Sequence, residues 1–179
     1  MVAISDAKTA LYQADGLDLP AVQEASSGGG LSDVADVKQI TNSDLLLLPV
    51  DVLIPAAISH QITTANVDDI KVKIILEMAN DPVTVEADMV LQKQGVVVIP
   101  DILANAGGVM VSYFEWIQNS SNDYWSLERV YTELETRITA AFSGLLESTE
   151  DSYVALRSDG YRLAIDRIIK AERARGRLS

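Results

Sequence analysis

Residues 72–99 read VKIILEMANDPVTVEADMVLQKQGVVVI, and this stretch decides the fold. Val72 to Leu76 and Val96 to Ile99 are short, almost entirely apolar runs, typical of strands that are covered on both faces. Thr84 to Gln94 lies between them, carries apolar side chains at helical spacing, and is followed by Gly95, a common helix stop. The stretch therefore predicts two parallel strands joined by a crossover helix.

Similar patterns lie on both sides of this unit. Further strands are predicted at Val2 to Ser5 and at Leu45 to Leu48, the latter continuing into Asp51 to Ile54. Apolar residues then recur every three or four positions, which predicts one long amphipathic helix through Leu127, Tyr131, Leu134, Ile138, Ala141 and Leu145. A last helix is predicted from about Gly160 to Arg173, and Ser26 to Gly30 is predicted to be a loop.

Composition limits the classes of function. The chain has 179 residues and no Cys, so thiolate metal sites and cysteine nucleophiles are excluded, and its single His60 rules out a multi-histidine metal site. We expect His60 at the surface, at the start of a helix. A net charge of −12 disfavours nucleic acids and anionic membranes as partners. No apolar run reaches the roughly 18 residues that a membrane span needs, so we expect a cytoplasmic protein. From the Cys and His counts we expect no bound metal.

The amino-terminal segment predicts an incomplete nucleotide-binding domain. Val2 to Asp6 has the pattern of the second strand of such a sheet, where an acidic residue meets the ribose. The chain contains no GxGxxG, and Gly28 to Gly30 follows no predicted strand, so it is rejected as a phosphate site. We predict an α/β, Rossmann-like parallel sheet that lacks its first strand and is followed by C-terminal helices. Residues 1–120 would form the partial dinucleotide-binding domain and residues 121–179 its helical segment.

Polar or small residues follow each predicted strand. Asp6 ends the first, where a carboxylate can accept both hydroxyls of an adenosine ribose or instead bond the following turn. Ala56 and Ala57 suit either a backbone that passes close to a flat ring or a plain turn. Asn80 offers an amide donor and acceptor. The paired glycines in residues 105–109 allow close approach to a ligand, or cap the next helix.

Four segments, in order, resemble the glutamate, leucine, phenylalanine and valine dehydrogenase family. They are VAISD at 2–6 with DGLD at 15–18; DVLIPAA at 51–57 with QIT at 61–63 and Asn66; KIILEMAN at 73–80 with EAD at 86–88; and IPDILANAGGVMVSYFEWIQN at 99–119. The last run is the most specific, and SYFEW within it resembles the glutamate branch. The resemblance extends to the YRLAIDRI segment at 161–168 and covers most of the chain, with a poor match at 21–45.

This resemblance implies roles for individual residues. The residue that matches Asn80 contacts the cofactor near the nicotinamide ribose. The residues that match Asn105, Gly108, Val109 and Ser112 line the nicotinamide and substrate pocket, and the Ser112 hydroxyl would face the side-chain carboxylate of the substrate. The alternative interpretation is a glycine turn that caps the next helix, with Ser112 bonded to its own backbone.

The resemblance also implies a cofactor and a reaction. Asp6 favours NAD because its charge repels a 2′-phosphate, although Lys8 could accommodate NADP. The implied function is that of the C-terminal nucleotide-binding half of an NAD(P)-dependent glutamate dehydrogenase, which converts L-glutamate to 2-oxoglutarate. The catalytic lysines and aspartate belong to an upstream substrate domain, so the chain alone is expected to be inactive, to meet its amino-acid substrate only with that domain, and to form homo-oligomers.

The motif around Asn80 departs from the family pattern. Family members have glycines on both sides of this Ala-Asn pair and a Pro-Thr-Thr after it, whereas this chain has Met78, Asp81, Val83 and Val85 among these positions. These replacements motivate a second hypothesis, a non-catalytic binding or regulatory protein that has retained the dehydrogenase sheet.

Overall fold

A computed structural model describes residues 1–149 and 155–178. The chain divides into two compact units, of which the first holds Met1–Val50 with Asp69–Lys71 and the second holds the rest. Each unit is described by itself. Within the described residues, no helix is long and apolar enough to cross a membrane.

The first unit is built on an antiparallel sheet in the order β1-β2-β3, formed by Ala3–Ser5, Ala10–Tyr12 and Lys38–Ile40. Ala3 lies opposite Tyr12, and Ala10 lies opposite Ile40. Helix α1 (Leu19–Gly28), the short 3₁₀ helix η1 (Leu31–Asp33) and helix α2 (Asn42–Leu46) complete the unit. Its core consists of Leu11, Leu17, Val22 and Leu31.

Three predictions for this unit are wrong. Val2 to Ser5 was expected in the parallel sheet, but β1 pairs antiparallel with β2 because a tight turn after Asp6 reverses the chain. Leu45 to Leu48 was expected to be a strand. The side chain of Thr41 instead accepts the Asp44 N–H in a capping box and starts helix α2. Ser26, Ser27 and Gly28 were expected in a loop but form the last turn of α1.

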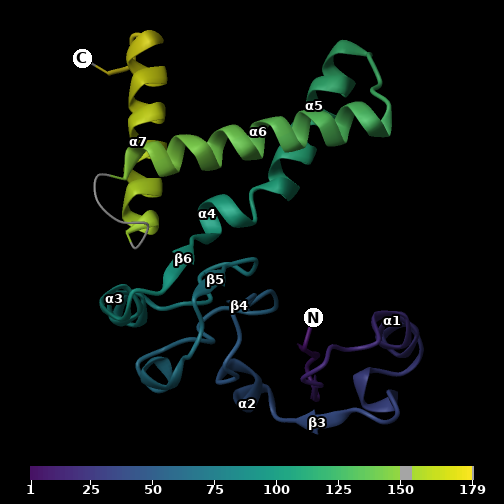
Figure 1. Ribbon diagram of the computed structural model, residues 1–179. Coiled ribbons are helices and arrows are strands. Elements are labelled where there is room, and N and C mark those ends of the chain that lie inside the picture. The colour runs from purple at the N-terminus through teal and green to yellow at the C-terminus, as the bar shows by residue number, and fades with distance from the viewer. Residues whose placement is uncertain (150–154, 179) are drawn as a thin grey trace. The chain divides into compact units, whose positions relative to one another are not determined.

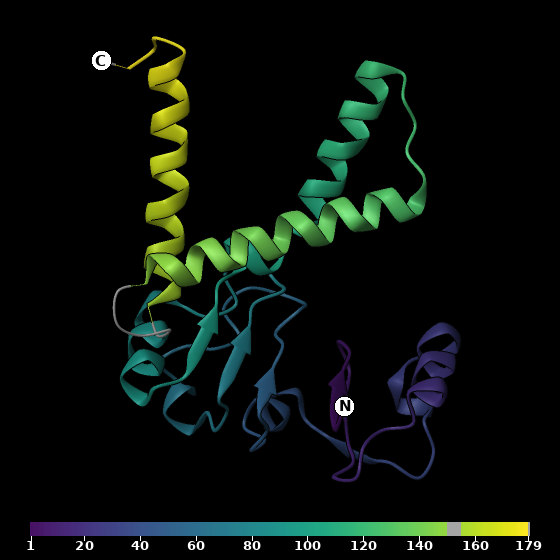
Figure 2. The ribbon, with the colours of Figure 1, turned by 45° about the horizontal axis from the view of Figure 1, so that its top comes forward.

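The second unit contains the predicted parallel sheet. Strands β4 (Val52–Leu53), β5 (Ile74–Leu76) and β6 (Val97–Ile99) pair in this order and run in the same direction (Figure 2). The crossover helix α3 (Val85–Gln94) joins β5 to β6, as predicted. Thr84 accepts the Ala87 N–H at its start, and Gly95 ends it with a φ of 76°, a left-handed conformation that favours glycine.

Four helices follow the sheet, and their bounds are α4 Asp101–Ala104, α5 Gly107–Ser121, α6 Leu127–Ser148 and α7 Leu156–Ala174 (Figure 1). Another 3₁₀ helix, η2, spans Val67–Asp69. The long amphipathic helix is confirmed as α6, and the last helix begins four residues earlier than predicted. The fold class, a parallel α/β sheet with C-terminal helices, is therefore confirmed. The division into residues 1–120 and 121–179 stays a prediction.

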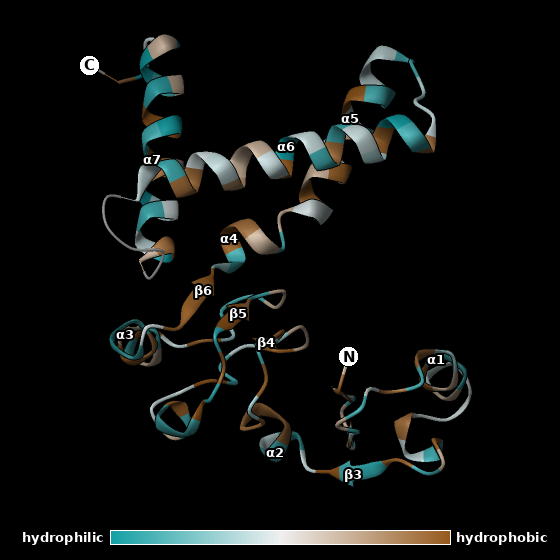
Figure 3. Ribbon diagram, in the orientation of Figure 1, coloured by the Kyte–Doolittle hydropathy of each residue, from teal (hydrophilic) through white to brown (hydrophobic). Residues whose placement is uncertain are grey.

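The central residues of the parallel sheet are buried. Ile75 and Val98 at the centre of β5 and β6 are almost fully buried, as is Leu91 on α3. Figure 3 shows β6 and part of α4 as apolar segments. Phe114 on α5 is fully buried against Trp125, with 5.5 Å between the ring centroids. This packing fixes α5 against the start of α6, beyond the carboxyl ends of the strands (Figure 2).

Candidate functional site at the carboxyl edge of the parallel sheet

The segments that follow β4, β5 and β6 are joined by backbone hydrogen bonds. The carbonyl oxygen of Pro55 accepts the N–H groups of Met78, at 3.1 Å, and Ala79, at 2.9 Å. The Glu77 N–H donates to the Ile99 carbonyl at 3.1 Å. These bonds extend the sheet past its regular strands and hold its carboxyl edge as one surface.

Two asparagines predicted to bind the cofactor meet at this edge. The amide nitrogen of Asn105 donates to the amide oxygen of Asn80 at 2.7 Å, although the two residues are 25 positions apart. Asn80 follows β5, and Asn105 ends the four-residue helix α4 that follows β6. Parallel strands end at the same edge, so this juxtaposition follows from the topology.

Small exposed residues follow β4. Ala56 and Ala57 are exposed, while Pro55 before them is buried. Pro55 bonds the segment after β5, which places the two alanines in a segment adjoining the one that carries Asn80. Their own side chains end at the β-carbon, so a ligand can approach the backbone closely.

The predicted substrate residues lie in the first turns of α5. Gly108, Val109 and Ser112 are all exposed, Val109 to 69%. The Ser112 hydroxyl donates to the Gly108 carbonyl at 3.1 Å, which is the backbone bond that the alternative interpretation predicted. An exposed hydroxyl can exchange such a bond for a ligand at little cost, so the substrate role of these residues stays a prediction.

Asp6 lies in the first unit and serves the turn that follows it. One carboxylate oxygen accepts the N–H groups of Lys8 and Thr9 at 2.7 and 2.9 Å, and the other accepts the Leu31 N–H at 3.1 Å. Gly30, with a φ of 128°, directs the Leu31 N–H toward this carboxylate. A carboxylate has about four acceptor positions. Three are occupied, so a grip on both ribose hydroxyls requires one backbone bond to yield, and the ribose role stays a prediction.

The same bonds predict an acid titration for this turn. Backbone N–H groups, first that of Thr9 and then those of Lys8 and Leu31, lower the pKa of the Asp6 carboxyl below its ordinary value. The unfolded chain therefore takes up this proton before the folded chain does. The stabilisation is present above a pH of about 4 and is lost as the pH falls through the lowered pKa. A carbon NMR titration of the Asp6 carboxyl should give a midpoint below about 3.9; a midpoint at or above that value would refute the assignment.

A buried ion cluster beside the edge was not predicted from the sequence. Arg157, in the first turn of α7, reaches three carboxylates: Glu77 after β5, Asp88 on α3 at 3.3 Å and Asp101 on α4 at 3.6 Å. Glu77 is fully buried and Asp88 is 5% exposed. One signal was available, namely an acidic residue directly after the apolar strand residues 74–76. Nothing in the sequence around Arg157, 80 residues away, indicated that it pairs with Glu77.

The departures from the family pattern have local consequences. Asp81, which stands where the family has a glycine, adopts a φ of 48°, a conformation that costs a side-chain-bearing residue about 1 kcal/mol. Its side chain lies 2.8 Å from the imidazole of His60, and its carbonyl accepts the His60 N–H. His60 is exposed, as predicted, but it lies in a loop with a φ of 55° and not at a helix start. Met78, which stands where the family has its other glycine, is 43% exposed.

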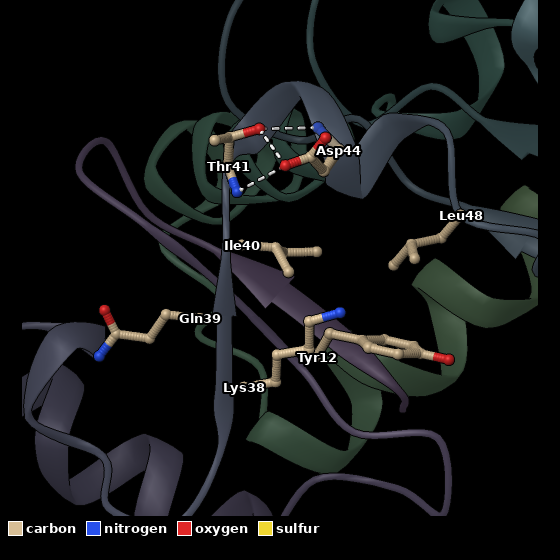
Figure 4. A pocket seen from close by; sticks show the side chains of 7 residues that line it. All are labelled: Tyr12, Lys38, Gln39, Ile40, Thr41, Asp44 and Leu48. Atoms are coloured by element: carbon tan, nitrogen blue, oxygen red, sulfur yellow. Dashed lines mark hydrogen bonds between the residues drawn. The ribbon is translucent and has the colours of Figure 1, made fainter.

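A separate open pocket lies within the first unit (Figure 4). It is lined by Tyr12, Lys38, Gln39, Ile40, Thr41, Asp44 and Leu48. Its polar groups Thr41 and Asp44 bond each other in the capping box of α2. None of the predicted site residues lines this pocket, so we assign it no chemistry.

The edge of the second unit defines a class of protein. Amides, small residues and a glycine pair at the carboxyl ends of parallel strands characterise α/β proteins that bind a ligand at that edge. The chain belongs to the glutamate/leucine/phenylalanine/valine dehydrogenase family, whose pattern matches residues 1–176.

Individual relatives agree with this assignment. The chain is 42% identical over 176 residues to an NAD-specific glutamate dehydrogenase from Staphylococcus aureus (strain COL), covering 98% of this chain and 42% of that protein. Among solved structures it resembles a hetero-hexameric glutamate dehydrogenase from Thermus thermophilus (leucine-bound form), with a TM-score of 0.86, 28% identity, and coverage of 97% of this chain and 41% of that one. A glutamate dehydrogenase from Peptoniphilus asaccharolyticus gives a TM-score of 0.74 at 32% identity, over 93% of this chain and 37% of that one. The chain thus spans about two fifths of the length of these relatives.

Proposed function

We propose that this chain forms the nucleotide-binding part of an NAD-dependent glutamate dehydrogenase. The observation that carries the proposal is the Asn80–Asn105 pair at the carboxyl edge of the sheet, 2.7 Å apart, in a chain that matches the dehydrogenase family almost throughout. NAD is preferred over NADP because the 42% identical relative is NAD-specific and Asp6 carries a negative charge that disfavours a 2′-phosphate.

The residues at the edge fit a dinucleotide. Asn80 is exposed, and its amide N–H groups donate to no partner within the described residues, so they are available to a ribose hydroxyl. Asn105 is half-buried and held by Asn80, which gives it a defined orientation. The exposed Ala56 and Ala57 leave the backbone accessible to a flat ring. When bound, the nicotinamide supplies the hydride acceptor.

The chain's own residues would bind and orient, and the proton chemistry would belong to other residues of the enzyme. The amides of Asn80 and Asn105 would fix the ribose of the cofactor. Gly108 and Val109 would line the space shared by cofactor and glutamate, and Ser112 would donate its hydroxyl to the side-chain carboxylate of glutamate after releasing the Gly108 carbonyl. Such positioning accounts for a large share of catalysis in reactions of this kind.

We also propose that the chain acts in an oligomer together with a substrate domain. In the described residues β1 has a neighbour only in β2, and β4 has one only in β5. An unpaired strand edge is a template for association. The Thermus relative is hetero-hexameric. A location in the cytoplasm stays a prediction from composition.

A titration with NAD tests the cofactor role of Asn105. We expect Asn105→Ala to weaken NAD binding about tenfold, because a lost hydrogen bond in a ligand site costs about 1–1.5 kcal/mol. Asn119→Ala, at an exposed position near the end of α5, is the matched control and should bind NAD as the unchanged chain does. Calorimetry or NMR shifts would measure both. Equal binding by the two variants, or no binding of NAD by the unchanged chain, would count against the proposal.

A non-catalytic binding protein that retains this sheet is the second candidate. Asp81 and Met78 favour it, since both stand at glycine positions of the family, one in a strained conformation and one with a half-exposed side chain at the edge. The two candidates differ in one experiment, in which the chain is combined with a substrate domain of the same family. NADH formation from glutamate would exclude the non-catalytic candidate.

A further inference from the structure

The asparagine pair is carried by two short segments that have little regular structure of their own. Asn80 lies in the loop after β5, next to the strained Asp81. Asn105 follows α4, which has only four residues and whose N-cap, Pro100, provides no side-chain hydrogen bond. A helix of this length is not stable by itself. Something outside these segments must set their relative position.

Two carboxylates connect these segments directly. One carboxylate oxygen of Glu77 bonds Arg157, and the other accepts the Asp101 N–H at 2.9 Å. This bond satisfies one of the free backbone N–H groups at the start of α4. One oxygen of Asp101 in turn accepts the Asp81 N–H at 2.8 Å. Asn80 precedes Asp81, and Asn105 lies one helical turn after Asp101, where its N–H donates to the Asp101 carbonyl. Glu77 and Asp101 therefore brace both asparagines.

These carboxylates depend on one cation. Glu77 is fully buried, and burial raises the pKa of its carboxyl above the ordinary value, while Arg157 acts in the opposite direction. The guanidinium of Arg157 is 14% exposed and spans Glu77, Asp88 and Asp101 with different nitrogens. A planar guanidinium can bridge several carboxylates at once, whereas an ammonium is a point charge. Without this bridge the like charges of Glu77 and Asp101 would move apart.

We infer that Arg157 is a positioning residue for the Asn80–Asn105 pair. It acts through Glu77 and Asp101, which set the loop after β5 and helix α4 at hydrogen-bonding distance from each other. This assignment gives the first turn of α7 a part in the nucleotide site, although Arg157 itself bonds neither asparagine in the described residues. A contribution of Arg157 to cofactor binding rests on the proposed function, whereas its effect on the Asn80–Asn105 pair does not.

The test uses the side-chain amide NMR signals of Asn80 and Asn105 in the full 179-residue chain. In Arg157→Lys we expect both signals to move, and the Asn105 amide protons to exchange with water at least severalfold faster than in the unchanged chain. Arg167→Lys, the same substitution at an exposed position of α7, should leave them in place. Unmoved signals in Arg157→Lys would overturn the inference.

A second control distinguishes a purely structural role of Arg157 from positioning of the asparagine pair. Leu145→Ala removes a buried apolar side chain of α6 next to Gly160 of α7, and destabilises the same region without removing a charge of the ion cluster. If the signals of Asn80 and Asn105 move as much in Leu145→Ala as in Arg157→Lys, Arg157 only attaches α7 and the inference fails. If they move only in Arg157→Lys, positioning is supported.

A double variant tests the route through Glu77. Glu77→Gln keeps an oxygen for the Asp101 N–H but removes the charge that Arg157 bonds. In the Glu77→Gln background, Arg157→Lys should move the asparagine signals much less than in the unchanged chain, since coupled residues are not additive. Additive effects of the two substitutions would overturn the route through Glu77.

Titration with NAD distinguishes this inference from the proposed function. If both hold, Arg157→Lys should weaken NAD binding roughly tenfold while the control Arg167→Lys does not, because small displacements of binding groups are costly. If the unchanged chain does not bind NAD but the asparagine signals still move in Arg157→Lys, the proposed function fails and the positioning role stands. If the unchanged chain binds NAD but the asparagine signals do not move in Arg157→Lys, the positioning role fails and the proposed function stands.

Discussion

Arg157→Leu is expected to lower the free energy of unfolding by about 3–5 kcal/mol at neutral pH, because it leaves buried carboxylates without a counter-ion. Glu77 is fully buried and Asp88 is 5% exposed, so neither can turn to water for compensation. Urea denaturation followed by circular dichroism measures the change. The expected loss is a large part of the 5–15 kcal/mol that stabilises an ordinary domain.

The loss should shrink as the pH falls. Burial already raises the pKa of the Glu77 carboxyl, and removal of Arg157 raises it further. A carboxyl with a raised pKa in the folded state holds its proton more tightly there than in the unfolded chain. Acidification through this range therefore stabilises the folded variant relative to neutral pH.

Arg175→Leu is the matched control, because Arg175 is 63% exposed and its pair with Glu172 contributes about 1 kcal/mol or less. A loss in Arg157→Leu no larger than in this control would contradict the prediction.

Phe114→Ala is expected to cost about 3–5 kcal/mol, the usual range for a fully buried Phe. Phe114 is 0% exposed, stacks at a tilt on Trp125 and lies under the guanidinium of Arg137, whose central carbon is 5.2 Å from the ring centre. Truncation leaves a cavity between α5 and α6. Because α5 carries Gly108 and Ser112, its first turns should also show faster hydrogen exchange.

Trp116→Ala serves as the control for this variant. Trp116 lies two positions further along α5, is 63% exposed and stacks on Tyr113, with ring centroids 6.0 Å apart. An exposed substitution of this kind usually changes stability by about 0.5 kcal/mol. Equal losses in the two variants would show that Phe114 is not the anchor of α5. All the aromatic residues of SYFEW have similar hydrophobicity, so the sequence alone does not separate the buried Phe114 from the exposed Tyr113 and Trp116.

Much of the second unit was predictable because its signals are local. The apolar runs before Glu77 and before Pro100 became β5 and β6, and the helix between them starts at the Thr84 cap and ends at Gly95. Parallel strand ends then place Asn80 and Asn105 at the same edge of the sheet. The first unit was harder, since the side-chain bonds of Asp6 and the capping box at Thr41 outweigh the apolar runs next to them.

The sequence by itself determined the β-α-β unit, the amphipathic helix α6 and the family, because strand and helix periodicity and caps depend on residues only a few positions apart. The tertiary structure alone decided the antiparallel pairing of β1 and the cluster of Arg157 with Glu77, Asp88 and Asp101. Arg157 and Glu77 are 80 residues apart, and a charge on a helix resembles any solvated charge until packing buries it. Burial makes such a partner necessary, and burial is a property of the whole fold.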